Sequence, residues 1–118
     1  MNKMQMGGII LYNLCLKVKK EIHTANKKEL RQKVAEFLGK YPESPVPHNL
    51  LGIILEMENK HLTAMKHFRA AYALDPTYKP VLHNLDMAAE LPTKRDADYG
   101  ESDGFMRPLL RIVGGVCR

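Results

Sequence analysis

The sequence has no tryptophan, only three phenylalanines and only two cysteines. Leu, Ile, Val, Met and Ala must therefore form most of any hydrophobic core. The two cysteines, Cys15 and Cys117, lie near opposite ends, with no CxxC pair and no zinc-like spacing with histidine. This pattern excludes a disulfide framework and a cysteine-based zinc site. We expect two thiols in a reducing compartment and therefore a cytoplasmic protein.

Long hydrophobic runs are also missing. Lys3 and the apolar run of about ten residues after it resemble a weak secretory signal, but Tyr12 and Asn13 interrupt the run and no small-x-small cleavage site follows. The run is much shorter than the ~20 residues that span a bilayer. We expect this stretch to be the first helix of a protein without a membrane span.

The motifs of common catalytic sites are absent as well. The sequence contains no GxxxxGK[ST], GxGxxG or GxSxG, and no Ser/His/Asp or paired-carboxylate arrangement on a plausible scaffold. Its five histidines form no HxxxH pair, and His61 and His67 are six residues apart, on different faces of a helix. We therefore expect no enzyme activity, no metal site and no cofactor.

Acidic residues are fewer than basic ones. Eighteen Lys and Arg against thirteen Asp and Glu give a formal charge of +5. Several basic residues cluster around the first two expected helices. They are Lys17, Lys19, Lys20, Lys27, Lys28, Arg31 and Lys33. The cluster is read first as a solvated face and alternatively as a nucleic-acid or acidic-partner patch, without the interleaved aromatics that stack on RNA.

What the sequence does contain is helical periodicity. Apolar residues recur at helical spacing in five stretches, at about 8–24, 27–41, 47–58, 61–74 and 78–90. Residues 1–7 are expected to fray. Asn26, with Glu29 three residues later, predicts a helix cap, and Thr77 predicts another. After Pro92 the chain becomes charged, glycine-containing and aperiodic, which predicts a flexible linker and a basic apolar tail over 92–118.

Two of these helices form a distinctive unit at 45–78. Pro42 and Pro76 are 34 residues apart, and each closes a helix pair. Within the unit, small residues stand where paired helices would cross, and larger ones stand along the seam. The positions are His48, Leu51, Gly52, Leu55, Ala64, Phe68, Ala71 and Pro76. In spacing and residue size they resemble the tetratricopeptide repeat family, which has this period.

The flanking segments resemble the family less closely. Residues 11–44 keep the register of a degenerate repeat, with Lys17 and Val18 where Leu-Gly is expected. Residues 79–91 match a partial repeat or capping helix, with Asp86 in place of glycine. The resemblance implies an all-α fold over 1–91, a short α-solenoid of antiparallel helix pairs with about five helices. Residues 92–118 would be a flexible tail.

The resemblance further implies a concave groove, lined by the first helix of each pair, that holds a peptide. The candidate groove residues are Tyr12, Lys19, Asn49, Ile53, Met57, His83, Asn84 and Met87. Some relatives clamp a peptide carboxylate with Lys, Asn and Arg. Here Leu50, Pro80 and Asn84 occupy three of those places, so that activity is not expected.

Three functions follow as hypotheses. The first is an adaptor that binds a peptide segment of another protein. The second is a self-associating scaffold, or one piece of a longer repeat protein, because fewer than three full repeats are present. The third is nucleic-acid binding through the basic first helix pair, which is the least favoured.

Overall fold

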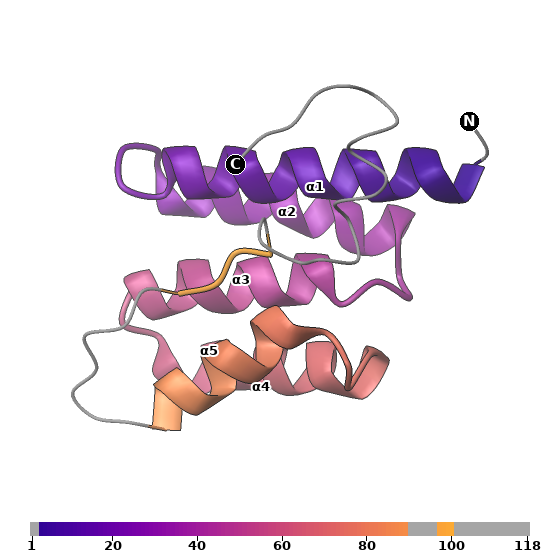
Figure 1. The fold of residues 1–118 in the computed structure, drawn as a ribbon. Helices are drawn as coiled ribbons and strands as arrows, with labels where there is room; N and C mark the ends of the chain where they lie inside the picture. Colours follow the sequence, from indigo (N-terminus) through magenta and orange to yellow (C-terminus); the bar gives the residue numbers. More distant parts are fainter. Residues whose placement is uncertain (1–2, 90–96, 101–118) are drawn as a thin grey trace.

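In the computed structural model, residues 3–89 and 97–100 are described. They contain five α-helices and no strand, which confirms the all-α prediction for this part of the chain (Figure 1). The helices are α1 (Lys3–Glu21), α2 (Lys27–Lys40), α3 (Val46–Met57), α4 (His61–Leu74) and α5 (Lys79–Ala89). None of the described helices combines the length and the apolar character that a bilayer crossing requires.

The helix boundaries follow from local chemistry. The side-chain oxygen of Asn26 accepts a hydrogen bond of 3.1 Å from the Glu29 amide, so the predicted cap of α2 is confirmed. Pro47 lies in the first turn of α3, where its missing N–H leaves no hydrogen bond unmade. Between α3 and α4, Asn59 adopts a φ of 63°, a left-handed conformation that Asn tolerates better than most residues.

Two boundaries differ from the sequence-based prediction. Helix α1 begins at Lys3, so residues 3–7 are helical and not frayed. The buried Gly7 lies beside the ring of Tyr41, the residue that follows α2. Thr77 does not cap α5. Its hydroxyl donates to Asp75 Oδ1 at 2.6 Å and its amide donates to the same oxygen at 3.0 Å. These bonds form a local turn, and α5 begins at Lys79.

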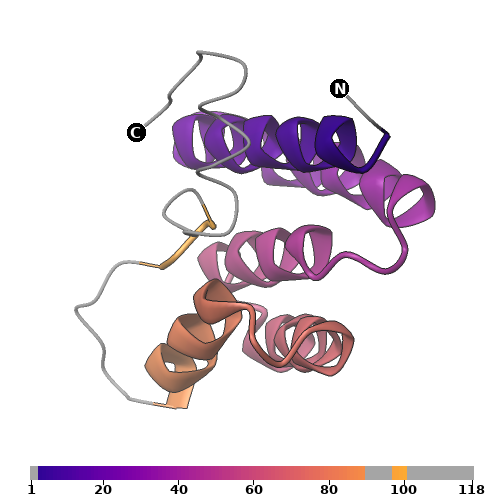
Figure 2. The ribbon, with the colours of Figure 1, turned by 45° about the vertical axis from the view of Figure 1, so that its right-hand side comes forward.

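The helices form two layers (Figures 1 and 2). Helices α1, α3 and α5 lie in one layer, and α2 and α4 lie in the other. Helix α3 is central, because it packs against each of the other four helices. Its Leu50 and Ile54 are fully buried, and the core continues through Val18 of α1, Ile22 just after α1, and Val34 of α2.

The α3–α4 seam depends on one glycine. A Cβ on Gly52 would lie 2.5 Å from the Phe68 ring, so the ring fills the space that a side chain would occupy. Of the eight residues assigned to repeat packing, six are buried. They are Leu51, Gly52, Leu55, Ala64, Phe68 and Ala71. His48 is half-buried, and Pro76 is exposed in the turn after α4.

Candidate functional site

Two asparagines are buried where α3 and α5 meet. Asn49 of α3 and Asn84 of α5 are both fully inaccessible to solvent. Asn84 Nδ2 donates a hydrogen bond of 2.8 Å to Asn49 Oδ1, which links the two side chains. A buried amide without partners would cost about 1–3 kcal/mol, so the remaining polar atoms of this pair need partners too.

Those partners belong to the backbone of Asp98. The Asp98 carbonyl oxygen accepts from Asn49 Nδ2 at 3.0 Å and from Asn84 Nδ2 at 2.8 Å. The Asp98 amide donates to Asn84 Oδ1 at 2.8 Å. Asn84 therefore holds both backbone polar groups of one residue, as a hydrogen-bonded residue of a neighbouring β-strand would. We call the two asparagine side chains the amide clamp.

The clamp places residues 97–100 on the face of α3 that also borders α1 and α5 (Figure 2). This segment has neither helical nor strand structure. It lies within 92–118, where composition predicts a flexible tail, and the structure places these four residues against the helices. Residues 92–96 and 101–118 lie outside the described residues.

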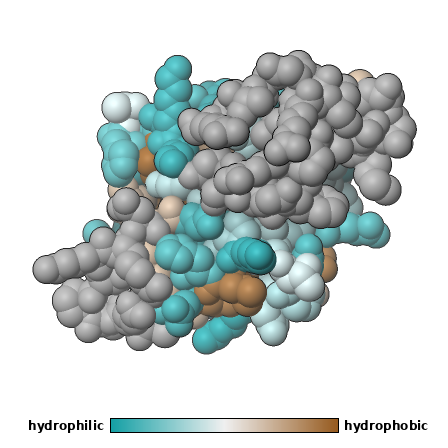
Figure 3. Space-filling view, in the orientation of Figure 1, coloured by the Kyte–Doolittle hydropathy of each residue, from teal (hydrophilic) through white to brown (hydrophobic). Residues whose placement is uncertain are grey.

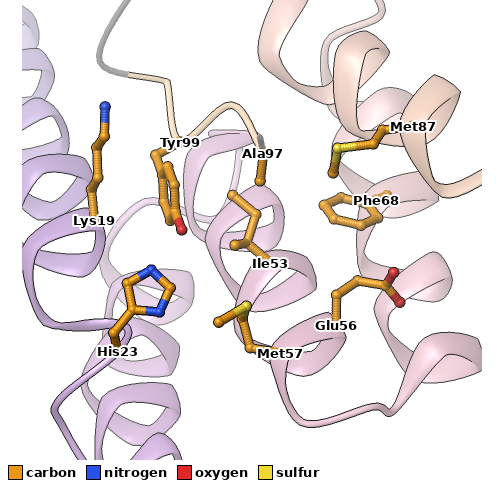
Figure 4. Close-up of a pocket in the computed structure, with 9 residues that line it drawn as sticks. All are labelled: Lys19, His23, Ile53, Glu56, Met57, Phe68, Met87, Ala97 and Tyr99. Carbon is orange, nitrogen blue, oxygen red and sulfur yellow. The ribbon is translucent and has the colours of Figure 1, made fainter. Parts of the chain in front are cut away.

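Tyr99 occupies the space beside the clamp. Only 8% of its surface is exposed, and its ring lies between Lys19 of α1 and Ile53 of α3, with the hydroxyl directed toward His23 (Figure 4). Tyr99 is one of the residues that line a cavity of about 420 Å³. Its lining is Lys19, His23, Ile53, Glu56, Met57, Phe68, Met87, Ala97 and Tyr99.

Gly100 ends the described segment in a conformation that suits only glycine. Its φ is +100°, and a Cβ there would lie 3.3 Å from Cys15 Sγ and in direct collision with the Tyr78 hydroxyl. The Gly100 amide also donates to Asp98 Oδ1 at 2.9 Å, which closes a short turn within the segment. The segment thus makes three kinds of contact: backbone hydrogen bonds at Asp98, ring packing at Tyr99, and a close approach at Gly100 that leaves no room for a side chain.

The sequence-predicted groove residues divide into three groups. Asn49 and Asn84 form the amide clamp, while Lys19, Ile53, Met57 and Met87 line the cavity. Tyr12 is instead 1% exposed within the core. His83 is half-buried on α5 and is not among the residues that line the cavity. The sequence-based expectation thus named both asparagines of the clamp, but it did not name the residues of 97–100 that they hold.

A histidine pair was also missed. His48 Nδ1 and His67 Nδ1 are 3.0 Å apart, and the two rings lie 5.3 Å apart between centroids. Burial lowers the pKa of both residues, and for His67 the His48 charge lowers it further. The pair is separated by nineteen positions in sequence, and a local motif search cannot find such a pair.

Two further surface features concern the alternative hypotheses of nucleic-acid binding and self-association. Arg31 of the basic cluster pairs with Glu58 at 2.8 Å, so it joins α2 to the end of α3. On the face drawn in Figure 3, the coloured hydrophobic residues appear as separate patches among hydrophilic ones. The large exposed apolar side chains of the described residues are spread over four helices. They are Met6, Ile10, Met57, Leu62, Tyr72, Leu74 and Leu82.

Within residues 3–89 and 97–100, His, Cys, Asp and Glu side chains do not gather in a group of three that could hold a metal ion. Comparison of the chain with protein-family models, with curated proteins and with solved structures gave no match. The geometry of the amide clamp and its cavity is therefore the basis for a functional proposal.

Proposed function

We propose that the chain is a short tetratricopeptide-type helical repeat protein that acts as an adaptor. In this proposal, a peptide segment of a partner protein binds across α1, α3 and α5. The observation that carries the proposal is the amide clamp, in which Asn49 and Asn84 hold the backbone of Asp98 on this face.

Two aspects of the chemistry support a peptide ligand. Hydrogen bonds to a backbone amide and carbonyl are available from any peptide, so they provide affinity without requiring one sequence. The cavity beside the clamp adds Ile53, Met57 and Met87, whose side chains can accommodate an apolar group of the ligand. Backbone hydrogen bonds together with an adjacent side-chain cavity are typical of peptide recognition.

The repeat assignment rests on the helix lengths and on the α3–α4 seam. Helices α2 and α4 each have fourteen residues and begin at Lys27 and His61, which are 34 residues apart. This spacing equals the tetratricopeptide period. The close approach of Gly52 to Phe68 provides the small-residue crossing that the resemblance implies. These features support a repeat-like arrangement of the two helix pairs.

A peptide-display selection on the full chain tests the proposal. The wild type should enrich peptides that the double variant Asn49→Ala/Asn84→Ala no longer binds, because the variant lacks the amide clamp. Asn13→Ala provides a matched control, since Asn13 is exposed on α1. Circular dichroism must show that the variants remain helical. Enrichment of the same peptides by the wild type and the double variant would rule out binding at the clamp.

A further inference from the structure

We infer that residues 97–100 are an internal ligand of the proposed groove, and that the partner segment shares their chemistry. The partner would present a backbone amide and carbonyl to the clamp, followed by an aromatic residue and then a glycine. This inference rests on the proposed function, because it names the class of peptide that the same site recognises. It also adds a competition between the chain's own segment and the partner's segment.

The first contact of the segment is independent of side-chain identity. Asp98 meets the clamp through its carbonyl oxygen and its amide, at distances of 2.8–3.0 Å. Its carboxylate instead accepts from the Gly100 amide and stabilises the turn of the segment itself. A partner residue can therefore replace Asp98 at the clamp, and Asp or Asn would best preserve the turn.

The second contact selects an aromatic side chain. The Tyr99 ring enters the space between α1 and α3, where Lys19 and His23 lie on one side and Ile53 on the other (Figure 4). The ring brings a large apolar surface against Ile53, and its hydroxyl stays near polar groups. Tyrosine suits such a site because it combines an apolar body with a polar tip.

The third contact selects glycine. The φ of +100° at Gly100 strains any other residue, and a Cβ would meet the Tyr78 hydroxyl and the Cys15 sulfur. These neighbours belong to the helical body and would be the same for a partner segment in this position. The groove therefore has a sequence preference for an aromatic residue followed by glycine.

The internal segment has an advantage over a partner because it is tethered. Only residues 90–96 connect the end of α5 to Ala97. A short connection of this kind gives an effective concentration on the order of millimolar. A partner must therefore outcompete the internal segment. Its apparent affinity equals its intrinsic affinity multiplied by the fraction of molecules whose groove is unoccupied. The internal segment sets a threshold for partner binding.

The test uses the full chain and a fluorescent peptide with the sequence of residues 95–102, RDADYGES. Binding is measured by anisotropy for the wild type, for Gly100→Ala and for Tyr99→Ala. Both substitutions weaken the internal segment and leave unchanged the groove residues contributed by α1, α3 and α5. The peptide should bind each variant at least about tenfold more tightly than it binds the wild type, because the cis competitor is lost.

Matched controls separate this effect from general destabilisation. Gly39→Ala introduces the same change in α2, where a Cβ meets nothing within 4 Å. Tyr72→Ala removes an exposed tyrosine from α4. Both control proteins should bind the peptide as weakly as the wild type does. In the Tyr99→Ala protein, adding Asn49→Ala/Asn84→Ala should abolish the binding.

Peptide variants test the preference. On the Tyr99→Ala protein, peptides with Ala in place of Tyr or in place of Gly should bind at least about tenfold more weakly than RDADYGES. Equal affinity of RDADYGES for the wild type and for both released variants would overturn the internal competition. Failure of both released variants to bind RDADYGES at millimolar concentration would overturn the inference as a whole.

The experiments can overturn the proposed function and the inference about the internal segment independently of each other. If display selection yields clamp-dependent peptides that lack an aromatic-glycine pair, the proposed function stands and the inference is overturned. Loss of clamp dependence in both experiments overturns both. Hydrogen exchange gives an independent check, since the Asp98 amide of the wild type bonds to Asn84 and should exchange slowly. In the folded Gly100→Ala protein the same amide should exchange faster. An unchanged exchange rate would contradict release of the internal segment.

Discussion

Gly52 and Phe68 set how closely α3 and α4 approach each other. Substituting alanine at Gly52 would place a methyl group 2.5 Å from the Phe68 ring, so the ring or the two helices must shift to accommodate it. Overpacking of this kind costs about 1–3 kcal/mol, which exceeds the roughly 1 kcal/mol that alanine gains over glycine in a helix. We predict that Gly52→Ala lowers the free energy of unfolding, measured by chemical denaturation.

The control for this prediction is the same substitution elsewhere. Gly39→Ala in α2 should raise the free energy of unfolding by up to about 1 kcal/mol, because its methyl group meets no neighbour. If both substitutions stabilise the protein, the α3–α4 seam is looser than the Gly52–Phe68 distance indicates.

The histidine pair predicts a pH dependence. The pKa of both His48 and His67 is lowered from the ordinary value of 6.5, with burial as the main cause. The unfolded chain therefore binds protons more readily just below pH 6.5, so acidification favours unfolding. The contribution of the neutral pair is complete above pH 6.5 and is lost as the pH falls toward the lowered values.

We predict a decrease in the free energy of unfolding between about pH 7.5 and pH 5.5 that is smaller in His48→Gln/His67→Gln. Chemical denaturation at both pH values measures it. His23→Gln serves as the control, because His23 is exposed. An identical pH dependence of the wild type and the double variant would show that other groups cause the decrease.

At the scale of single elements, α2 offers a direct test of helix capping. Asn26→Ala removes the side-chain oxygen that accepts from the Glu29 amide, and loss of such a cap costs about 1 kcal/mol. We predict a corresponding decrease in the free energy of unfolding. Asn26→Ser should retain most of the stability, since serine also caps well. Equal losses in both variants would attribute the effect to something other than the cap.

Much of the helical structure was predictable, because it depends on local signals. Apolar spacing, prolines and the Asn26 cap predicted five helices near their observed positions. The start of α1 was missed because residues 3–6 carry weak periodicity and are followed by Gly7 and Gly8, whereas the contact between Gly7 and Tyr41 is non-local. The predicted Thr77 cap is absent because the Thr77 hydroxyl donates to Asp75 Oδ1 instead.

The site was only partly predictable for the same reason. Asn49 and Asn84 were identified through the resemblance of their helices to a repeat. Nothing in the local sequence of residues 97–100 indicates that distant asparagines hold the Asp98 backbone. A charged, glycine-containing stretch resembles a linker even when its contacts come from residues 14 and 49 positions away. The contacts that hold this segment come from residues distant in the sequence, so no local sequence pattern predicts them.

Across the whole molecule, α3 connects the other elements. It packs against all four remaining helices, and nine of its twelve residues are buried. Opening of α3 therefore disrupts its interfaces with all four other helices, whereas the α4–α5 interface does not involve α3. We predict that the amides of α3 show the slowest native-state hydrogen exchange and those at the start of α1 exchange faster. NMR measures both. Faster exchange in α3 than in α2 would contradict this order.

The position of Cys15 has a practical consequence. This thiol is fully buried, and its sulfur lies beside Gly100 of the internal segment. We predict that departure of the segment from the groove exposes the sulfur to an alkylating reagent. In a Cys117→Ser variant, the alkylation rate of Cys15 should report how often the segment leaves the groove. Mass spectrometry measures this rate on the unlabelled protein.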